Sequence, residues 1–239
     1  MSRKLRIAGS IVVGVLPMPI ARVFYRWFFG YKIGKRVRIG FSIIDVGICE
    51  IGDDVKIGHF NVFSGTRDLS IGEHTRIGVL NIFRGGNTIK IGRYCDILRQ
   101  NEINSIPEPE TVNVADPTCI LGDGCMIGAS HKIDFTDRVE FGKSVILGGR
   151  NSSVWTHNRQ ITMPVSVGDH SYLGSEIRIA PGGAIAANCI VGIGAVITKQ
   201  LKNENQLIAG VPAREVKELG EEGRFLVERK TRNDLPDDI

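Results

Sequence analysis

Two histidines of this 239-residue chain stand where side chains could move protons. His157 follows Trp155 and Thr156 at the start of a segment that departs from the regular pattern around it, and His131 lies three residues before Asp134. An imidazole accepts or donates a proton near neutral pH, and a carboxylate can orient it. Asp134 could equally cap a turn, and Trp155 could pack in a core or offer an apolar plane to a sugar ring. These residues are the first candidates for a reactive site.

The elements that must position them follow a six-residue period. Most of the aliphatic residues that mark this period are followed by Gly or Ala; they are Val167, Leu173, Ile179, Ile185, Val191 and Ile197. One short strand and one turn per repeat, with the aliphatic side chain pointing inward, predict a parallel β-helix. We therefore expect an all-β fold.

Upstream, the coils gain two residues. Ile51, Ile71 and Ile91, each followed by Gly, are spaced by 20 residues, as are Leu121 and Phe141. Three hexapeptides plus two residues predict a coil of three flat faces with a bulge at one corner, which makes a triangular prism. A solenoid grows along one axis, so we expect a single β-helix domain over residues 32–213.

Two segments leave the period and should form loops. Residues 100–118 are rich in Glu, Pro and Asn, and residues 155–166 include His157. Loops on rigid scaffolds are where binding and chemistry concentrate. The second loop therefore favours His157 over the other histidines.

Two sets of residues recur at the same position in successive coils, one set facing the interior of the prism and the other lying along one of its edges. The first set should point inward; it contains Cys49, Val55, Thr75, Cys95, Cys125, Val145, Ser171 and Cys189. With five cysteines and no C-x-x-C, we expect buried thiols in a reducing cytoplasm rather than disulfides or metal ligands. The second set should stack as a ladder; it contains Asn61, Asn81, Asn101, His131 and Asn151. His131 either substitutes for Asn there or supports the active site.

The two ends do not follow the period. Residues 1–31 hold an apolar stretch from Ile7 to Val15, shorter than the roughly 20 residues that span a bilayer, and lack a small-residue signal cleavage site. They should cap the open end of the solenoid, and basic residues beside Trp27 could also contact an anionic membrane face; the two roles are compatible. Residues 214–239 should form a helix from about Arg214, then a tail.

The net charge of +4, with Lys and Arg dispersed, gives no basic stripe and argues against nucleic-acid binding. The Gly content of 29 residues and the 7% of aromatic residues fit stacked β-branched side chains with Gly at corners. Composition therefore agrees with the solenoid.

Several motifs together resemble a known family. They are Trp155-Thr-His157, Val167-Gly-Asp-His-Ser-Tyr-Leu-Gly-Ser175, Ile179-Ala-Pro-Gly-Gly183, Gly192-Ile-Gly-Ala-Val-Ile-Thr-Lys199 and Ala209-Gly-Val-Pro-Ala-Arg214. In this order they resemble the left-handed β-helix, or hexapeptide-repeat, acyltransferases. The nearest branch is the sugar and polysaccharide O-acetyltransferases of the maltose, galactoside and colanic acid type.

The resemblance implies a homotrimer with active sites in grooves between prisms, acetyl-CoA as acyl donor and no metal. His157 would be the general base for a saccharide hydroxyl, and the backbone N–H of Ser175 would stabilise the oxyanion. Coenzyme A would lie along five residues: Tyr172, Ile193, Thr198, Lys199 and Arg214. Trp155 and Asn158 would bind the acceptor, with His131 and Asp134 as supporting catalytic residues.

Three alternatives stay open. The acceptor could be the amine of a nucleotide-linked sugar, or the chain could be an inactive scaffold. A zinc-dependent carbonic anhydrase would need three imidazoles at one metal, yet the histidines at 59, 74, 131, 157 and 170 lie in different coils.

Overall fold

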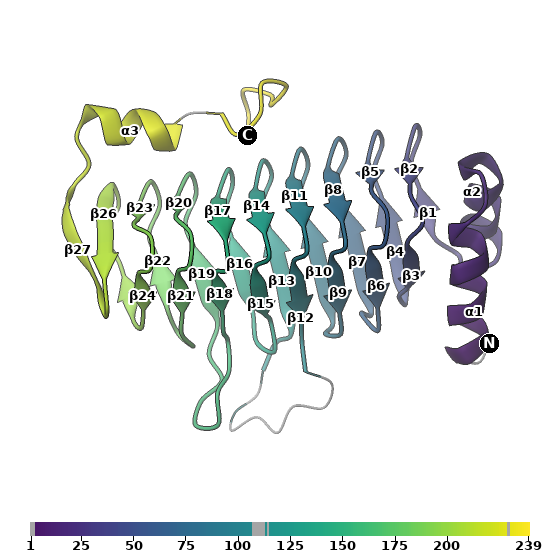
Figure 1. The fold of residues 1–239 in the computed structure, drawn as a ribbon, viewed down its shortest axis with the longest axis horizontal. Coiled ribbons are helices and arrows are strands. Elements are labelled where there is room, and N and C mark those ends of the chain that lie inside the picture. Colours follow the sequence, from purple (N-terminus) through teal and green to yellow (C-terminus); the bar gives the residue numbers. More distant parts are fainter. Residues whose placement is uncertain (1–2, 107–112, 114, 229) are drawn as a thin grey trace.

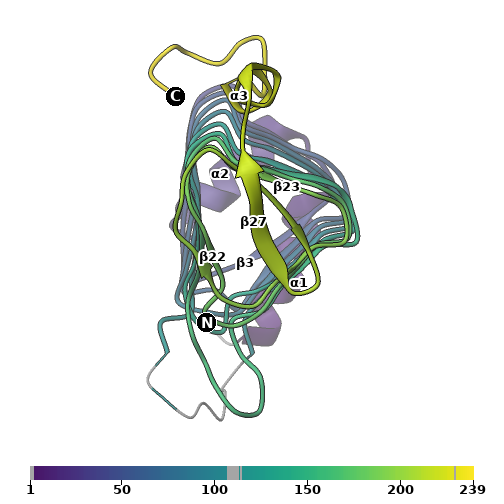
Figure 2. The ribbon, with the colours of Figure 1, turned by 90° about the vertical axis from the view of Figure 1, so that its left-hand side faces the viewer.

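Three parallel sheets run along the length of a solenoid, seen from the side in Figure 1 and along its axis in Figure 2. The computed structural model describes residues 3–106, 113, 115–228 and 230–239. Sheet 1 contains β1 (Lys32–Ile33), β4 (Ile48–Ile51), β7 (Asp68–Ile71), β10 (Thr88–Ile91), β13 (Thr118–Leu121), β16 (Val139–Phe141), β19 (Val165–Val167), β22 (Ala184–Ile185) and β25 (Gln200–Leu201).

The other two sheets complete each coil. Sheet 2 contains β2 (Arg38–Ile39), β5 (Lys56–Ile57), β8 (Arg76–Val79), β11 (Asp96–Arg99), β14 (Met126–Ala129), β17 (Ile146–Arg150), β20 (Tyr172–Leu173), β23 (Ile190–Val191), β26 (Gln206–Gly210) and the antiparallel β27 (Ala213–Glu218). Sheet 3 contains β3 (Ile43–Asp45), β6 (Val62–Ser64), β9 (Ile82–Arg84), β12 (Glu102–Asn104), β15 (Lys132–Asp134), β18 (Ser153–Val154), β21 (Arg178–Ile179) and β24 (Val196–Ile197). The predicted β-helix fold class is confirmed.

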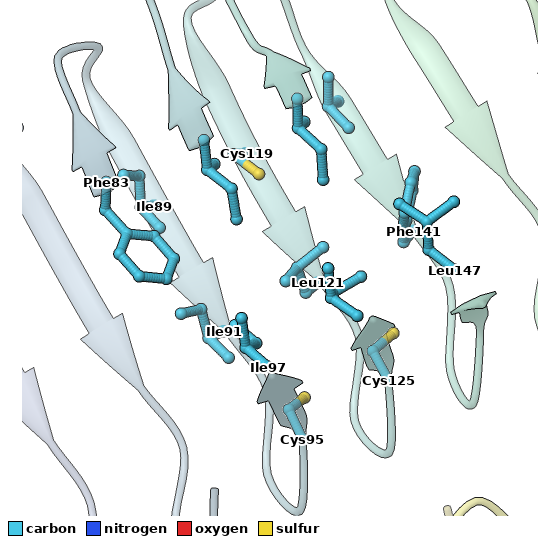
Figure 3. Packing of buried hydrophobic residues seen from close by; sticks show 14 of the residues in the cluster. Phe83, Ile89, Ile91, Cys95, Ile97, Cys119, Leu121, Cys125, Phe141 and Leu147 are labelled. Carbon is cyan, nitrogen blue, oxygen red and sulfur yellow. The ribbon is translucent and has the colours of Figure 1, made fainter. Parts of the chain in front are cut away.

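The predicted period sets the register of the sheets. Ile51, Ile71 and Ile91 are direct partners in sheet 1, and the residues spaced by six from Val167 to Ile197 are at most 3% exposed. Figure 3 shows the interior, where aliphatic side chains of sheet 1 meet those of sheet 2. Full burial of such a side chain stabilises the fold by about 1.5–3 kcal/mol. The core is therefore a stack of aliphatic layers.

We name the three edges of the prism by what lies on them. At the tail edge the chain turns from sheet 1 to sheet 2, as in residues 72–75. At the ladder edge it turns from sheet 2 to sheet 3, as in residues 80–81, and at the site edge from sheet 3 to sheet 1, as in residues 155–164. Turns at the tail edge contain a residue with positive φ, including His74 (φ 59°) and His170 (φ 54°). These two histidines are corner residues of the scaffold.

The predicted inward column of small residues lies at the tail edge and is buried throughout. The Thr75 hydroxyl donates to the carbonyl of Gly92, and the Cys125 thiol contacts that of Gly142 at 3.0 Å. Cys49 is an exception, because it lies within β4 opposite Leu69 and so belongs to another column. All five cysteines are free and buried, and burial raises the pKa of the Cys119 thiol to about 12.

The ladder edge carries the predicted stack, with one correction. Asn81 donates through Nδ2 to Oδ1 of Asn61, and Asn101 does the same to Asn81, both at 3.0 Å. His131 follows, and its backbone N–H donates to Oδ1 of Asn101. The prediction of Asn151 is wrong: Ser152 occupies the next step and donates its N–H to Nδ1 of His131. An irregularity where β17 pairs with β14 moves the column by one residue.

His131 is thus a ladder member, and we expect it to make stability depend on pH. Burial lowers its pKa to about 4, although the carbonyls of Leu147 and Gly149 oppose the shift. Between this value and the ordinary 6.5 the unfolded chain binds more protons, so the free energy of unfolding should fall as pH falls through that window. The loss should reach at most about 3 kcal/mol.

The replacement His131→Asn supplies the amide used elsewhere in the ladder. It should preserve the fold and activity and remove this pH dependence. Denaturant unfolding at about pH 4.5 and 7.5 measures the effect. An equal pH dependence in the native chain and the variant would contradict the assignment.

Helices cover the N-terminal end of the solenoid, and strand β27 lies across the opposite end (Figure 2). At the N-terminal end, α1 (Arg3–Gly14) packs on β3 and α2 (Met18–Trp27) on β1, beyond the first coil (Figure 1). None of the described helices has the length and apolarity needed to cross a membrane. At the other end the expected helix start near Arg214 is wrong: residues 213–218 form β27, because they pair with β26, and α3 (Glu221–Glu228) begins later.

The chain then turns back along the tail edge. Arg232, 8% exposed, donates to the carbonyl of His74 and pairs with Asp96 and Asp234, while Thr231 donates to the carbonyl of Gly124. These contacts hold residues 230–239 against the middle coils.

Candidate active site

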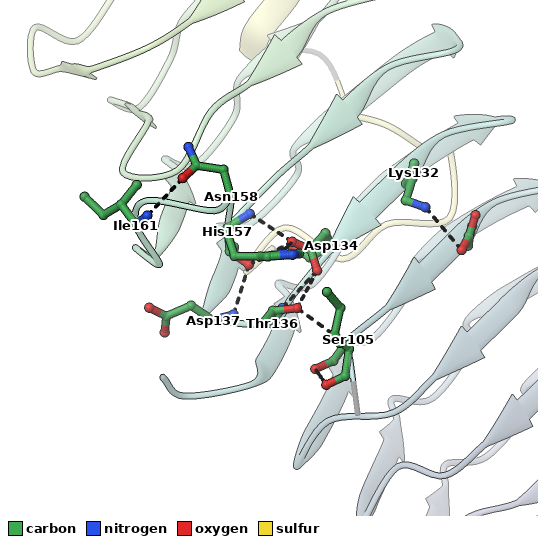
Figure 4. Close-up of polar contacts among 11 residues, drawn as sticks. Ser105, Lys132, Asp134, Thr136, Asp137, His157, Asn158 and Ile161 are labelled. Atoms are coloured by element: carbon green, nitrogen blue, oxygen red, sulfur yellow. Dashed lines mark hydrogen bonds and ion pairs between the residues drawn. The ribbon is translucent and has the colours of Figure 1, made fainter. Parts of the chain in front are cut away.

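A histidine and a carboxylate meet at the site edge, where strands β15 and β18 end (Figure 4). Nδ1 of His157 lies 2.5 Å from Oδ2 of Asp134. The Asp134 side chain is 2% exposed, whereas the His157 side chain is 23% exposed. The carboxylate is therefore a buried support, and the imidazole reaches solvent.

Neighbouring threonines hold Asp134 in place. Oδ1 accepts a hydrogen bond from the Thr136 hydroxyl at 2.7 Å and from the Thr136 backbone N–H at 3.2 Å. Oδ2 accepts from the backbone N–H of Thr156 at 3.3 Å. A carboxylate that only accepts requires the proton on Nδ1 of His157, which leaves the lone pair of Nε2 as the acceptor. This is the tautomer that a general base needs.

The loop around His157 is ordered by short-range contacts. His157 forms an isolated antiparallel bridge with Thr162, and Oδ1 of Asn158 accepts the backbone N–H groups of Gln160 and Ile161. From the preceding loop, Asn113 donates to the carbonyl of Thr162 at 2.8 Å and accepts its N–H. The two predicted loops thus contact each other beside the candidate base.

An open pocket of about 730 Å³ lies against His157. It is lined by Trp155, Asn158 and Arg159 on one side and by Arg178, Ala180 and Pro181 of the next coil on the other. Trp155 is 36% exposed, and Nζ of Lys132 lies 5.3 Å from its ring centroid. The pocket offers apolar surface, two guanidinium groups and one imidazole to a small polar molecule.

Known proteins share this fold and part of this sequence. Over 108 residues, 45% of this chain and 48% of the relative, the sequence is 27% identical to galactoside O-acetyltransferase of Escherichia coli. Over 109 residues, 43% of this chain and 44% of the relative, it is 26% identical to a putative acetyltransferase of Schizosaccharomyces pombe. The match spans about half the length of these relatives. No family model matches the chain.

A solved structure extends the likeness to most of the solenoid. The UDP-N-acetylglucosamine acyltransferase of Campylobacter jejuni superposes with a TM-score of 0.61 over 78% of this chain and 70% of that one, at 19% identity. The chain has the fold of the hexapeptide-repeat acyltransferases. The resemblance predicted from the sequence is confirmed.

Within this acyltransferase fold, the residues expected to act together lie on two different edges. Trp155, His157 and Asn158 are at the site edge, and Thr198 and Lys199 lie on the same edge two coils further on, both exposed. Ser175 and Ile193 lie at the ladder edge, before the strands of sheet 3, and Gly194 donates its N–H to the carbonyl of Ser175. Sheet 3 separates the two groups within one chain.

The remaining predicted residues lie apart from the pocket. Tyr172 is on sheet 2, in a hollow shared with Leu226 and Lys230 of the C-terminal segment. Arg214 is exposed on β27. His131 belongs to the ladder, not to the pocket of His157. Among the residues that the structure describes, no three His, Cys, Asp or Glu side chains gather in a way that could hold a metal ion.

Sequence reasoning missed several residues of the site. Thr136 and Thr156 fix Asp134, while Arg159 and Arg178 line the pocket. A signal was available for two of them: Thr156 precedes His157 directly, and Arg178 is the register partner of Ser153, at the start of the strand that leads to Trp155. Thr136 and Arg159 lie in irregular segments between strands, where the six-residue period does not predict the position of a side chain.

Proposed function

We propose that this chain is an acetyltransferase that uses acetyl-CoA and acetylates a hydroxyl of a sugar or polysaccharide precursor. The observation that carries this proposal is the 2.5 Å contact between the buried Asp134 and His157, which lines an open pocket. The names of three sequence relatives, one a galactoside O-acetyltransferase and two given as putative acetyltransferases, support the reaction class. The metal-free chemistry needs only a base, an oxyanion site and a place for the donor.

In the proposed reaction the acceptor hydroxyl attacks the thioester carbonyl while Nε2 of His157 takes its proton. Asp134 holds Nδ1–H and stabilises the imidazolium that forms. The tetrahedral intermediate then collapses, the C–S bond breaks, and the coenzyme A thiolate leaves and takes up the proton. Ester and thiol are the products, and no covalent enzyme intermediate is involved.

The split of the candidate residues over two edges supports a site shared between chains. The site edge of one chain supplies His157, Trp155 and Asn158, and the ladder edge of a neighbour supplies the backbone N–H at Ser175 and the exposed Ile193, which is 74% exposed. We place the donor along this groove, with Lys199 and Arg214 near its phosphates. A homotrimer closes three such grooves.

The trimer is directly measurable. Sedimentation equilibrium should give three times the chain mass of 26.2 kDa across the micromolar range. A stable monomer that retains full turnover would contradict the shared groove, because a single chain keeps His157 and Ser175 on opposite sides of sheet 3.

The identity of the acceptor is tested with a panel of sugars, oligosaccharides and amino sugars. Release of the coenzyme A thiol from acetyl-CoA should be stimulated by one or more sugars or oligosaccharides with free hydroxyl groups. Stimulation by amino sugars alone would favour the N-acetyltransferase that we keep as the second candidate, since an amine could occupy the same pocket. If no acceptor and no acetyl-CoA binding were found, the result would favour the inactive scaffold instead.

Five buried free thiols support placement in the cytoplasm.

A further inference from the structure

The outer face of the N-terminal cap is apolar where a water-exposed helix face is normally polar. Helix α1 turns its polar side chains toward the prism: Ser10 is fully buried and donates to the carbonyl of Ile44 at 2.8 Å, and Arg6 pairs with Asp45. Among residues 5–14, the part of α1 whose side chains the structure describes, the exposed side chains are apolar, including Val12 (59% exposed). This orientation is the reverse of an ordinary surface helix.

Helix α2 extends the same face. Tyr25 and Ala21 are buried against the solenoid, whereas large apolar side chains point outward. We call the exposed set the cap face; it consists of Leu5, Ile7, Ile11, Val12, Val15, Ile20, Val23, Phe24, Trp27 and Phe28. An open apolar groove of about 320 Å³ lies between the two helices, lined by residues such as Val12 and Phe28. Contiguous apolar surface of this kind marks an interaction site.

Charge identifies the kind of partner. The first 44 residues contain nine of the chain's 30 Lys and Arg and none of its 26 Asp and Glu, so the dispersal of charge expected for the whole chain does not hold at this end. Arg26 is exposed on α2 next to Trp27, and the exposed Arg38 lines one hollow with Met18 and Pro19 of α2. A second copy of the chain would bring two such basic ends together and repel, whereas an anionic surface would attract them. Nucleic acid would use the basic groups and leave the apolar ones in water.

We propose that the cap face docks on a lipid bilayer that contains anionic headgroups, with the apolar side chains of α1 and α2 in the interface and the basic residues against the headgroups. Short amphipathic helices with Trp, Phe and flanking Lys or Arg bind membranes in this way, lying in the interface rather than crossing it. Trp27, 85% exposed at the end of α2, is suited to this depth. The inference does not depend on the proposed acetyl transfer, since lipid binding is measured without turnover.

The test is co-sedimentation of the full chain with vesicles of equal parts phosphatidylglycerol and phosphatidylcholine. Binding should be at least about tenfold weaker to pure phosphatidylcholine, given the attraction of each basic residue to an anionic surface. The triple variant Val12→Ser, Val15→Ser and Trp27→Ser should bind the mixed vesicles at least about tenfold more weakly, because apolar burial is lost. Val216→Ser with Phe225→Ser is the matched control: these side chains are 59% and 65% exposed at the opposite end, and binding should not change.

A second readout needs no change in the cap. In a Trp155→Phe background, the fluorescence of Trp27 should shift to shorter wavelength when mixed vesicles are added. Three results would overturn the proposal. They are no binding of the native chain to mixed vesicles, equal binding by the triple Ser variant, or an assembly larger than the trimer that forms without lipid and is absent in the triple Ser variant. The last would assign the cap face to a second copy of the chain.

Discussion

Replacing His157 by Ala should lower turnover by about 10²- to 10⁴-fold while leaving the oligomer and acetyl-CoA binding nearly unchanged. The physical reason is that the contact with Asp134 leaves the lone pair of Nε2 as the acceptor that faces the pocket, and His157 is the one imidazole among the described residues that line this pocket. Steady-state release of coenzyme A thiol measures kcat and KM with the acceptor found in the panel.

A second variant tests whether the loss of activity is specific to His157 or follows the removal of any histidine. His170→Asn removes a histidine at the tail edge, and Asn tolerates its positive φ of 54°, so activity should be retained. Near-native turnover by the His157→Ala variant, or an equal loss in His170→Asn, would show that the base has been assigned to the wrong coil.

Asp134→Asn should also cost about 10²- to 10⁴-fold in kcat, with little change in KM. An amide at this position can donate to Nδ1, which moves the proton of His157 to Nε2 and removes the acceptor from the pocket. The amide oxygen can still accept both hydrogen bonds from Thr136, and only the 3.3 Å contact from the Thr156 backbone N–H is lost, so the fold should survive. Kinetics with both substrates and a thermal melt measure these effects.

The control is Asp137→Asn at the same edge. Asp137 is also buried, at 6% exposed, but it accepts backbone N–H groups of Asp116 and Arg138 and does not contact His157. It should alter stability rather than the pH profile of kcat. If the two variants lost activity equally and in the same pH-independent way, Asp134 would be only a structural residue.

The six-residue period predicted most of the fold because each residue of the period faces a core of the same width. It set the register of sheet 1 through Ile51, Ile71 and Ile91, and it placed the ladder up to His131. It failed at Asn151, because the irregularity at β17 adds one residue: Leu147 and Val154 are seven residues apart, whereas their partners Ile127 and Ile133 are six apart. A longer interruption, residues 155–166, follows in the same coil, so the sequence does not show where the single extra residue lies.

The C-terminal segment shows a different limit. Residues 213–218 have helix-compatible side chains, yet their backbone groups are satisfied by the edge of β26, which a sequence pattern does not reveal. Tertiary pairing here overrides a weak local preference. The helix forms only at Glu221, after the sheet has ended.

For the candidate site, sequence reasoning named both members of the His157–Asp134 contact, but it predicted neither that contact nor the spatial division of the other residues. His157 stood out because it lies at the start of an interruption of the period, whereas Asp134 was named for its position three residues after His131. That Ser175 and Ile193 lie across sheet 3 from them depends on which edge each turn occupies, which requires the complete coil lengths. The complete coil lengths would also have identified Arg178 as a residue next to the pocket.

The most direct measurement follows the acetyl group itself. The chain is incubated with acetyl-CoA labelled in the acetyl carbonyl and with the acceptor that best stimulates thiol release, and the products are separated by mass spectrometry before and after mild base. We expect label on the acceptor as a base-labile ester, in equal amount to the thiol released, and about 10²- to 10⁴-fold less label in the same time with the His157→Ala variant. Label found only in free acetate, or transferred equally well without His157, would contradict acetyl transfer by general-base catalysis at this site.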